Sequence, residues 1–466
     1  MTESLVNQLI DAHHYPRPDQ MWDRGDAVEV ATGLAAAALH VTGSLPIHHL
    51  EEYWLYHPDG IWRIMPKATL RGVVSAWAGT PIYAVDKQGE EKPKPLRINN
   101  TKVYVDELEA VCAREGCGDG TFDRAAAGVA FANGFLRVEG AGAHLTPLDA
   151  DHLCRSGYGF DYAPVSEAPP MFASYLNSLW DVDQAARLEL VQEWLGMAIL
   201  GLSSTYHRAL VLKGRKGSGK STFIDILKGL LPVGDATGDE ASVTPEQFGD
   251  DPYLYKLALA KINAVYEGED RPIMDQARLR AVVSGETISI NIKYRAMPLT
   301  TRIRCAHIFA YNDLPQVPGA HAAFWDRFIV LDLDRSVRGT SEEIEGLARK
   351  ILEGERAQLV SWCIEGGLRA LARGRYAIPA SCEHQLKLWS GDADSVSAWL
   401  DHAAVVTPDH WTDLASIYRS YRDWAVDAGM SPVNQRTFGR RLRHLDGVLE
   451  RLCPATRRAQ LSIALR

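Results

Sequence analysis

Long apolar runs are missing from this sequence. The longest one lies near residues 195–202, whereas a transmembrane helix needs about 20 consecutive apolar residues. The chain opens with MTESLVNQLIDAHH, which is polar and amphipathic and therefore unlike a secretory signal peptide. From these two absences we expect a soluble, cytoplasmic protein that has no membrane partner.

Cysteine is scarce and scattered, with 7 residues in a chain of 466. An odd number of widely spaced cysteines argues against a disulfide scaffold. Cys112 and Cys117, followed later by His152 and Cys154, fit the spacing of no common zinc finger. We therefore expect buried or incidental thiols and no structural metal at these positions.

The chain also lacks the excess of positive charge that a protein coating nucleic acid would carry. It has 50 Lys and Arg against 59 Asp and Glu, which gives a net charge of −9. Any contact with nucleic acid must then come from local basic patches. The length favours about three domains, and an apolar share of 46% is enough for hydrophobic cores.

One glycine-rich segment carries a complete phosphate-binding pattern. Residues 210–224 read LVLKGRKGSGKSTFI, which is an apolar strand-like run, a loop of P-loop spacing and an amphipathic helix. Glycines allow positive φ, so backbone N–H groups and the helix N-terminus can face an anion. A chance glycine turn is the alternative, and the order of strand, loop and helix argues against it. We expect ATP or another nucleoside triphosphate with Mg²⁺, held by Gly214, Gly217, Ser218, Gly219, Lys220, Ser221 and Thr222.

Two further strand-like runs end in polar residues that suit hydrolysis. LALAKINAVYEGED (257–270) turns acidic at Glu267, which we expect to join the Mg²⁺ shell with Ser221 or to polarise the attacking water. Glu269 or Asp270 would support it, and a solvated acidic turn is the alternative. RCAHIFAYNDLP (304–315) reaches Asn312, whose amide would bond the γ-phosphate and orient that water, although such a sequence is also an ordinary turn.

Arg327 lies just before an apolar run in AHAAFWDRFIVLDLD (320–334). An exposed arginine here would reach the γ-phosphate of a neighbouring subunit, and such fingers raise hydrolysis by about 10³–10⁵. The alternative is a local ion pair with Asp326 or Asp332.

A hairpin is predicted between the acidic strand and the asparagine strand. In LRAVVSGETISINIKYRAMPLTTRIRC (279–305), two β-prone arms flank Lys293 and Arg295 near the tip. Cations in this place can grip a phosphate backbone without reading sequence. Tyr294 would either stack on a base or pack in the arm.

Residues 436–466 are locally basic, with eight Arg against Asp446 and Glu450. SPVNQRTFGRRLRHL (431–445) predicts a helix whose core stripe is Phe438, Leu442 and Leu445, and VLERLCPATRRAQLSIAL predicts two strands around a basic turn. This pattern suits a winged helix-turn-helix on DNA, with a solvated charged face as the alternative. The candidate DNA-contacting residues of this unit are Arg436, Arg440, Arg443, Arg457 and Arg458.

Near the N-terminus, EEYWLYHPDGIWRIM (51–65) predicts two aromatic-rich strands around a Pro-Asp-Gly turn. We expect Trp54, Tyr56 and Trp62 to pack on one another, and base stacking is the less favoured alternative.

The order of these motifs resembles that of the superfamily 3 helicases, and more narrowly the helicase part of phage, plasmid and poxvirus primase–helicases. The motifs are the P-loop, the acidic strand, the SGE…KYR hairpin, FAYNDLP and FWDRF, and YHPDGIWRI, NGFLRV, LTPLDADHL, DYAP and SLW…VQEWLG extend the likeness upstream over roughly 50–466. The resemblance implies an AAA+-like fold, a ring-shaped homo-hexamer, ATP hydrolysis between subunits and translocation on single-stranded or forked DNA in a bacterial or phage-infected host cell. It places Lys220 and Ser221 in the P-loop, Glu267 at the acidic strand end, Lys293 on the hairpin, Asn312 as the sensor and Arg327 as the finger.

The sequence departs from the family pattern at two positions. Ser218 stands where the family commonly has Asn, and it can still bond within the loop. Gly268 separates Glu267 from Glu269, whereas the family acids are closer to contiguous, which leaves open which acid is catalytic. No primase motif lies upstream, so a primase or a replication initiator would be a separate chain.

We predict an α/β protein with an AAA+-like P-loop NTPase core, an α-rich N-terminal domain and a C-terminal winged helix. The expected units are an accessory region (1–100), a mostly helical pre-helicase domain (101–202), the ATPase core (203–335), a helical lid or connector (336–390) and the DNA-binding unit (391–466). The leading hypothesis is an ATP-driven DNA helicase that serves replication of a phage, plasmid or other mobile element. Its alternatives are an initiator that melts an origin without processive unwinding, and a P-loop switch ATPase with no role on DNA.

Overall fold

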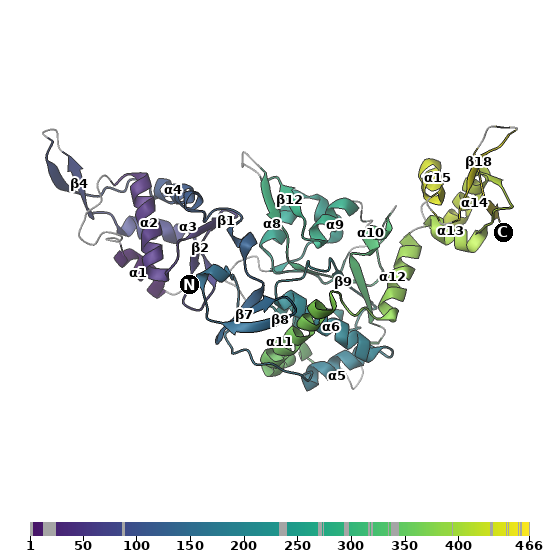
Figure 1. Cartoon of the computed structure of the whole chain (residues 1–466), viewed down its shortest axis with the longest axis horizontal. Helices are drawn as coiled ribbons and strands as arrows, with labels where there is room; N and C mark the ends of the chain where they lie inside the picture. Colours follow the sequence, from purple (N-terminus) through teal and green to yellow (C-terminus); the bar gives the residue numbers. More distant parts are fainter. Residues whose placement is uncertain are drawn as a thin grey trace.

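The chain is laid out along one long axis (Figure 1). Its N-terminal elements lie at one end, a body built around a parallel sheet lies in the middle, and the last 70 or so residues lie at the other end. The computed structural model describes residues 3–12, 25–85, 89–232, 240–268, 273, 275–292, 298–315, 317, 320–333, 335–336, 344–393, 395–428, 432–443, 445, 447–454, 456 and 459–465.

A five-stranded sheet organises the middle of the molecule, and its paired strands are all parallel. Successive side chains alternate between two hydrophobic cores, so that Leu210 and Leu212 face one core while Ala209 and Val211 face the other. Strands covered on both faces are mostly apolar, as the sequence of these runs predicts; Asn263 and His307 are buried polar exceptions. In spatial order the strands are β10 (Glu240–Ala241), β11 (Ile262–Val265), β14 (Ala306–Tyr311), β9 (Ala209–Gly214) and β15 (Phe328–Leu333).

Four helices contribute to the core on one face of the sheet: α5 (Pro170–Leu179), α6 (Gln184–Ile199), α7 (Lys220–Leu230) and α11 (Leu347–Arg373). The backbones of α6 and α11 approach so closely that a Cβ on Gly196 would lie 2.0 Å from the carbonyl oxygen of Cys363. The fully buried carboxylate of Glu193 lies between the same two helices and accepts hydrogen bonds from Arg369 and Arg373. This packing fixes α11, which in turn holds α5 beside the site described below.

The other face carries shorter elements, among them the predicted hairpin. Its arms form an antiparallel pair between β12 (Thr287–Ile290) and β13 (Leu299–Arg302), which confirms the two-armed prediction. Lys293 and Arg295 at its tip lie outside the described residues. The neighbouring elements are a 3-10 helix (Pro245–Gly249), α8 (Asp251–Leu259), α9 (Gln276–Val283), α10 (Ala322–Trp325) and α12 (Ala380–Ala393).

The N-terminal end has its own core. The predicted aromatic hairpin is present and the turn passes through Gly60 at φ +85°. Trp54 and Trp62 are almost fully buried around the ring of Phe122, so these two indoles serve packing and are not available to stack on bases. The elements here are α1 (Glu3–Asp11), α2 (Ala27–Thr42), β1 (Ile47–His49), β2 (Glu52–Tyr56), β3 (Trp62–Met65), α3 (Lys67–Ala76), β4 (Pro81–Val85), β5 (Glu91–Pro95) and α4 (Thr101–Arg114).

The segment 101–202, which we expected to be mostly helical, also contains a three-stranded antiparallel sheet. The strands are β6 (Gly128–Phe131), β7 (Gly134–Glu139) and β8 (Gly142–Thr146), and they are flanked by 3-10 helices at Thr121–Arg124 and Ala150–His152. The glycines explain the difference. Gly134 adopts φ +144°, and a Cβ there would lie 2.6 Å from the carbonyl oxygen of Thr146, so a glycine turn supports strands in place of a helix.

The C-terminal unit has a separate core that contains Phe438 and Leu442, with Leu445 half-buried beside it, which confirms the predicted stripe. Its predicted strand pair is also present. α12 continues to Ala393, so the boundary expected at 390 falls inside a helix; the single Gly391 costs only about 1 kcal/mol there. The elements are α13 (Ser395–Ala403), β16 (Ala404–Val406), β17 (Thr412–Asp413), α14 (Leu414–Asp427), α15 (Gln435–Arg443), β18 (Glu450–Leu452), β19 (Ala459–Leu461) and β20 (Ile463–Leu465).

Within the described part of the chain, no helix is long and apolar enough to cross a membrane. The same residues contain no group of three or more His, Cys, Asp or Glu side chains placed to hold a metal ion. Cys112, Cys117, Cys154, Cys305, Cys363 and Cys382 are free thiols.

Candidate functional site

The glycine-rich loop connects the end of β9 to the start of α7, and its glycines are required by their surroundings. Gly217 and Gly219 adopt φ values of +86° and +89°, a region that favours glycine. A Cβ on Gly214 would lie 2.8 Å from the carbonyl oxygen of Leu333, and one on Gly219 would lie 3.0 Å from Leu179. On the side where α5 and β15 approach the loop, there is therefore room for its backbone but not for side chains.

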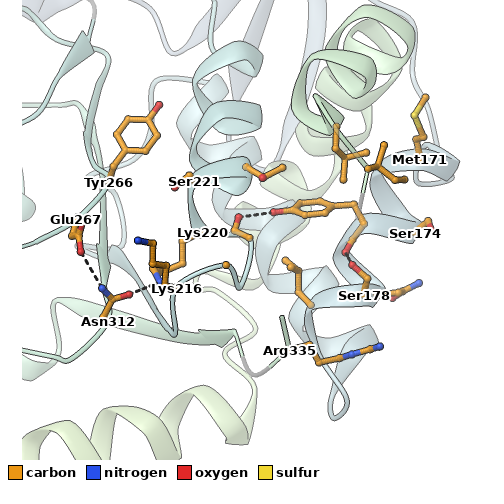
Figure 2. Close-up of a pocket in the computed structure, with 18 residues that line it drawn as sticks. Met171, Ser174, Ser178, Lys216, Lys220, Ser221, Tyr266, Glu267, Asn312 and Arg335 are labelled. Atoms are coloured by element: carbon orange, nitrogen blue, oxygen red, sulfur yellow. Dashed lines mark hydrogen bonds between the residues drawn. The ribbon is translucent and has the colours of Figure 1, made fainter. Parts of the chain in front are cut away.

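Lys220 is buried at the first turn of α7 and its ammonium group is held by three acceptors. Nζ donates to the carbonyl oxygens of Gly214 and Arg215 and, over 2.9 Å, to Oδ1 of Asn312. Asn312 in turn donates from Nδ2 to a carboxylate oxygen of Glu267 over 3.0 Å (Figure 2). Burial lowers the pKa of Lys220, while the negative charge of Glu267 acts in the opposite direction. Lys220, Asn312 and Glu267 thus form one hydrogen-bonded chain.

The parallel sheet explains why these three residues meet. β11, β14 and β9 are neighbours, and Tyr311 at the end of β14 pairs with Lys213 near the end of β9. The carboxyl ends of parallel strands share one edge of the sheet, where ligands of open α/β sheets bind. Residues that follow the three strands are therefore brought together although they are far apart in the sequence.

A cavity of about 870 Å³ opens over this edge. It is bounded by the loop and α7, by the strand ends, by α5, and by residues at the start of α11. Ser221 and Glu267, the two expected Mg²⁺ ligands, both line it. The lining residues are Met171, Ser174, Tyr175, Asn177, Ser178, Leu179, Lys216, Gly217, Gly219, Lys220, Ser221, Thr222, Tyr266, Glu267, Asn312, Arg335, Ile344 and Leu347.

The structure gives a reason for the glycine that separates the two acids. The N–H of Gly268 donates to the carbonyl oxygen of Ala310 over 2.8 Å, and a Cβ at this position would lie 2.0 Å from the ring of Tyr311. A second acid directly after Glu267 would collide with that ring. Glu267 contacts Asn312 and lines the cavity, whereas Glu269 lies outside the described residues.

Ser218 differs from our expectation that its side chain bonds within the loop. Its hydroxyl oxygen is buried and makes no hydrogen bond, and only its backbone N–H donates to the carbonyl oxygen of Arg215. The hydroxyl lies close to Gly214, where an added Cβ would be only 2.6 Å from it, so this position also requires glycine.

Arg327 lies away from this cavity. It precedes β15, whose first residue Phe328 pairs with Ala209 at the start of β9, whereas the loop follows the end of β9. The five steps from Ala209 to Gly214 correspond to about 16 Å along the strand. The guanidinium of Arg327 donates to the hydroxyl of Ser284 over 2.9 Å, and its described contacts do not include the two aspartates considered as ion-pair partners.

The structure describes only some of the candidate DNA-contacting residues. Arg436 is exposed on α15. Arg443 is also exposed, but its guanidinium makes a two-bond ion pair with Glu450, at 2.9 and 2.7 Å, which reduces its net charge. Lys293, Arg295, Arg457, Arg458 and the side chain of Arg440 lie outside the described residues.

Sequence reasoning missed several residues of the cavity, notably Tyr175, Tyr266 and Arg335. Arg335 follows the end of β15, so the strand-end rule used for Glu267 and Asn312 would have found it. Tyr175 is on α5 and its hydroxyl donates to the carbonyl oxygen of Gly219 over 3.1 Å; no local sequence signal marks this contact. The loop also carries two cations, Arg215 and Lys216, and Lys216 lines the cavity.

This chain was compared with protein families, curated proteins and solved structures. A model for a family of unknown function (DUF5906) matches residues 212–327. No curated protein matches the chain. The fold is similar to that of the NrS-1 C-terminal region: an apo structure matches at 12% identity over 94% of this chain and 99% of that chain with a TM-score of 0.47, and an A-form apo structure at 13% identity over 90% and 96% with a TM-score of 0.45. At this level of similarity the match carries no information on activity or ligands.

Proposed function

We propose that this protein is an ATP-dependent DNA helicase with a P-loop core of AAA+ type, which acts in the replication of a phage, plasmid or other mobile element. The observation that carries the proposal is the chain of hydrogen bonds from Lys220 through Asn312 to Glu267, beside the glycine-rich loop. Three sequence motifs that suit ATP hydrolysis thereby meet in one cavity. A chance glycine turn would not be accompanied by an amide in contact with its lysine and an acid in contact with that amide.

The residues of the cavity have distinct roles in this proposal. Lys220 exchanges its contacts with the loop carbonyls for the β- and γ-phosphates of ATP, because phosphate is the stronger partner for a buried ammonium group. Glu267 polarises the attacking water, and Asn312 keeps the carboxylate aligned and bonds the γ-phosphate. Nucleotide binding also uses the backbone of the loop and the start of α7, at Thr222 among others.

The donor set also fits a magnesium ion. Ser221 and Glu267 line the same cavity and supply the hydroxyl and carboxylate oxygens that Mg²⁺ prefers. When bound, Mg²⁺ supplies positive charge that neutralises the β- and γ-phosphate oxygens.

The position of Arg327 supports hydrolysis between subunits. Its distance from the loop of its own chain means that it can reach a γ-phosphate only in a neighbouring copy. A closed ring supplies each site with such a neighbour, and we propose a homo-hexamer.

Two basic features would contact DNA. In this proposal Lys293 and Arg295 grip a strand in the ring, and the C-terminal unit binds duplex as a winged helix through Arg436, Arg440, Arg457 and Arg458. The paired β12–β13 arms and the separate hydrophobic core of the C-terminal unit support this assignment. Arg443 is expected to contribute less than Arg436 because of its ion pair with Glu450. A primase or a replication initiator would be a separate partner.

Strand displacement on a forked DNA without any origin sequence tests the proposal. Wild type is expected to separate the strands with ATP and Mg²⁺, and Lys220→Ala is expected to abolish this. Tight binding to one duplex sequence without displacement would favour an origin-melting initiator. ATP hydrolysis that DNA does not stimulate would favour a switch ATPase.

A further inference from the structure

The cavity has two chemically different ends. One end is polar and holds Glu267, Asn312 and the ammonium group of Lys220. At the other end, on the opposite side of the loop in Figure 2, α5 presents Met171 and Ser174. The hydrolysis mechanism proposed above uses only the polar end.

The direction of Lys220 fixes the orientation of a bound nucleotide. Its Nζ lies beside Asn312 and Glu267, so the γ-phosphate belongs at that end. The rest of the molecule must then extend across the loop, away from the polar end and toward α5.

The wall at this second end carries exposed apolar side chains beside the polar Ser174 and Ser178 of α5. Met171 is 38% exposed and Ile344 is 50% exposed, and both line the cavity with Leu347. Large apolar side chains that remain in contact with water beside a phosphate site can bury a flat ring at little cost in ordering.

α5 is held rigidly enough to serve as such a wall. The buried carboxylate of Glu355 on α11 accepts hydrogen bonds from the first N–H groups of α5, those of Met171 and Phe172, at 2.7 and 2.9 Å. It thereby satisfies donors that a helix start leaves unpaired and complements the helix dipole. At the middle of α5, the hydroxyl of Tyr175 bonds the carbonyl oxygen of Gly219, which ties the helix to the phosphate loop itself.

We propose that α5, together with Ile344 and Leu347, is the nucleoside-binding wall of this site and holds the base and ribose of a nucleoside triphosphate mainly by apolar contact. The inference rests on the proposed nucleotide binding and assigns the part of the site that binds the nucleoside. Glu355 and Tyr175 are positioning residues, because they act through α5 and the loop.

Binding of ATP compared with inorganic tripolyphosphate, both with Mg²⁺ and measured by calorimetry on the full chain, tests this assignment. Tripolyphosphate has the phosphates of ATP and lacks its nucleoside. Wild type is expected to bind ATP at least tenfold more tightly. Ser174→Trp fills the wall end of the cavity from an exposed position. It is expected to weaken the binding of ATP at least tenfold and to change the affinity for tripolyphosphate by less than twofold.

Ala186→Trp is the matched control, since Ala186 is exposed on the neighbouring helix α6 and does not line the cavity; both affinities should stay at the wild-type value. A second variant, Met171→Gln, keeps side-chain length while removing apolar contact, and should weaken ATP alone. The assignment is overturned if wild type binds both ligands equally, or if Ser174→Trp leaves ATP binding unchanged or weakens both ligands alike. Lys220→Ala distinguishes the underlying function: it should weaken both ligands, and unchanged binding of both would reject the phosphate site itself.

Discussion

At the scale of single residues, Asn312 is the most informative position in the cavity. Its amide uses both of its polar ends, with the oxygen accepting from Lys220 and the nitrogen donating to Glu267. It therefore lies between the ammonium group of Lys220 and the carboxylate of Glu267 and bonds both.

Asn312→Ala is expected to lower kcat for ATP hydrolysis about 100-fold, which is the usual cost of removing one well-placed hydrogen-bonding group from a site of charge development. Steady-state hydrolysis and equilibrium ATP binding, measured on the same preparation, check this. Binding should remain, because the loop and Lys220 are intact. A kcat within twofold of wild type would show that the amide has no role in hydrolysis.

Gly268 illustrates a residue whose identity is imposed by a distant neighbour. Gly268→Ala would place a methyl group 2.0 Å from the Tyr311 ring, so the ring or the strand end must shift. We expect a loss of about 1–3 kcal/mol in the free energy of unfolding, as is typical of overpacking, and a further loss of hydrolysis because Glu267 is adjacent.

Gly249→Ala is the control for this prediction, because the nearest atoms to its added Cβ lie 3.8 Å away and its φ is not positive. Urea denaturation of both variants provides the measurement. Equal midpoints for the two variants would contradict the proposed collision.

At the scale of elements, β14 carries a buried imidazole at the centre of the sheet. His307 contacts Asn263 and the sulfur of Cys305, and burial lowers its pKa to about 3. The unfolded chain takes up a proton at this position below about pH 6.5, whereas the folded chain does not. The contribution of the neutral His307 to the free energy of unfolding is therefore fully present above pH 6.5, and it is lost as the pH drops toward 3.

His307→Gln should remove this contribution. Between pH 6 and pH 5, the unfolding free energy of wild type is expected to fall by about 1 kcal/mol more than that of the variant. Denaturant titrations at the two pH values measure the difference. His144→Gln, on the exposed part of β8, should leave the pH dependence unchanged, and an identical slope for His307→Gln would show that the imidazole is protonated in the folded state.

At the scale of the whole molecule, the layout separates the cavity from the arginine that would complete it. Arg327 and the loop lie at opposite ends of neighbouring strands, so the chain cannot close the site on itself. In the proposed function, hydrolysis therefore depends on assembly, because an isolated copy holds Arg327 and the loop in different places.

Mixing two inactive variants tests this connection. Lys220→Ala and Arg327→Ala are each expected to be inactive, but in a 1:1 mixed ring about one quarter of the junctions pair an intact Lys220 with a neighbour's intact Arg327. ATP hydrolysis should therefore recover to roughly that fraction of wild type. A mixture that stays as inactive as its components would reject a finger acting between subunits.

The sequence alone determined those features that depend on local chemistry. Glycine spacing and the apolar strand before it identified the loop, β-prone arms identified the β12–β13 hairpin, and the i, i+4, i+7 stripe identified the face that buries Phe438 and Leu442. Because parallel strands end at one edge, the same reasoning also brought Glu267 and Asn312 to Lys220. Each of these inferences uses residues that are close in the sequence or one rule of sheet geometry.

Only the tertiary structure decided which distant surfaces meet. The ring of Tyr311 excludes a side chain at Gly268, the hydroxyl of Ser218 is left without a partner, and Glu355 holds α5 beside the loop from a helix nearly two hundred residues away. These outcomes depend on how helices and strands pack, since steric contact and hydrogen bonding act over a few ångströms whatever the separation along the chain. For this reason the polar end of the cavity could be predicted from its motifs, whereas the wall that faces it could not.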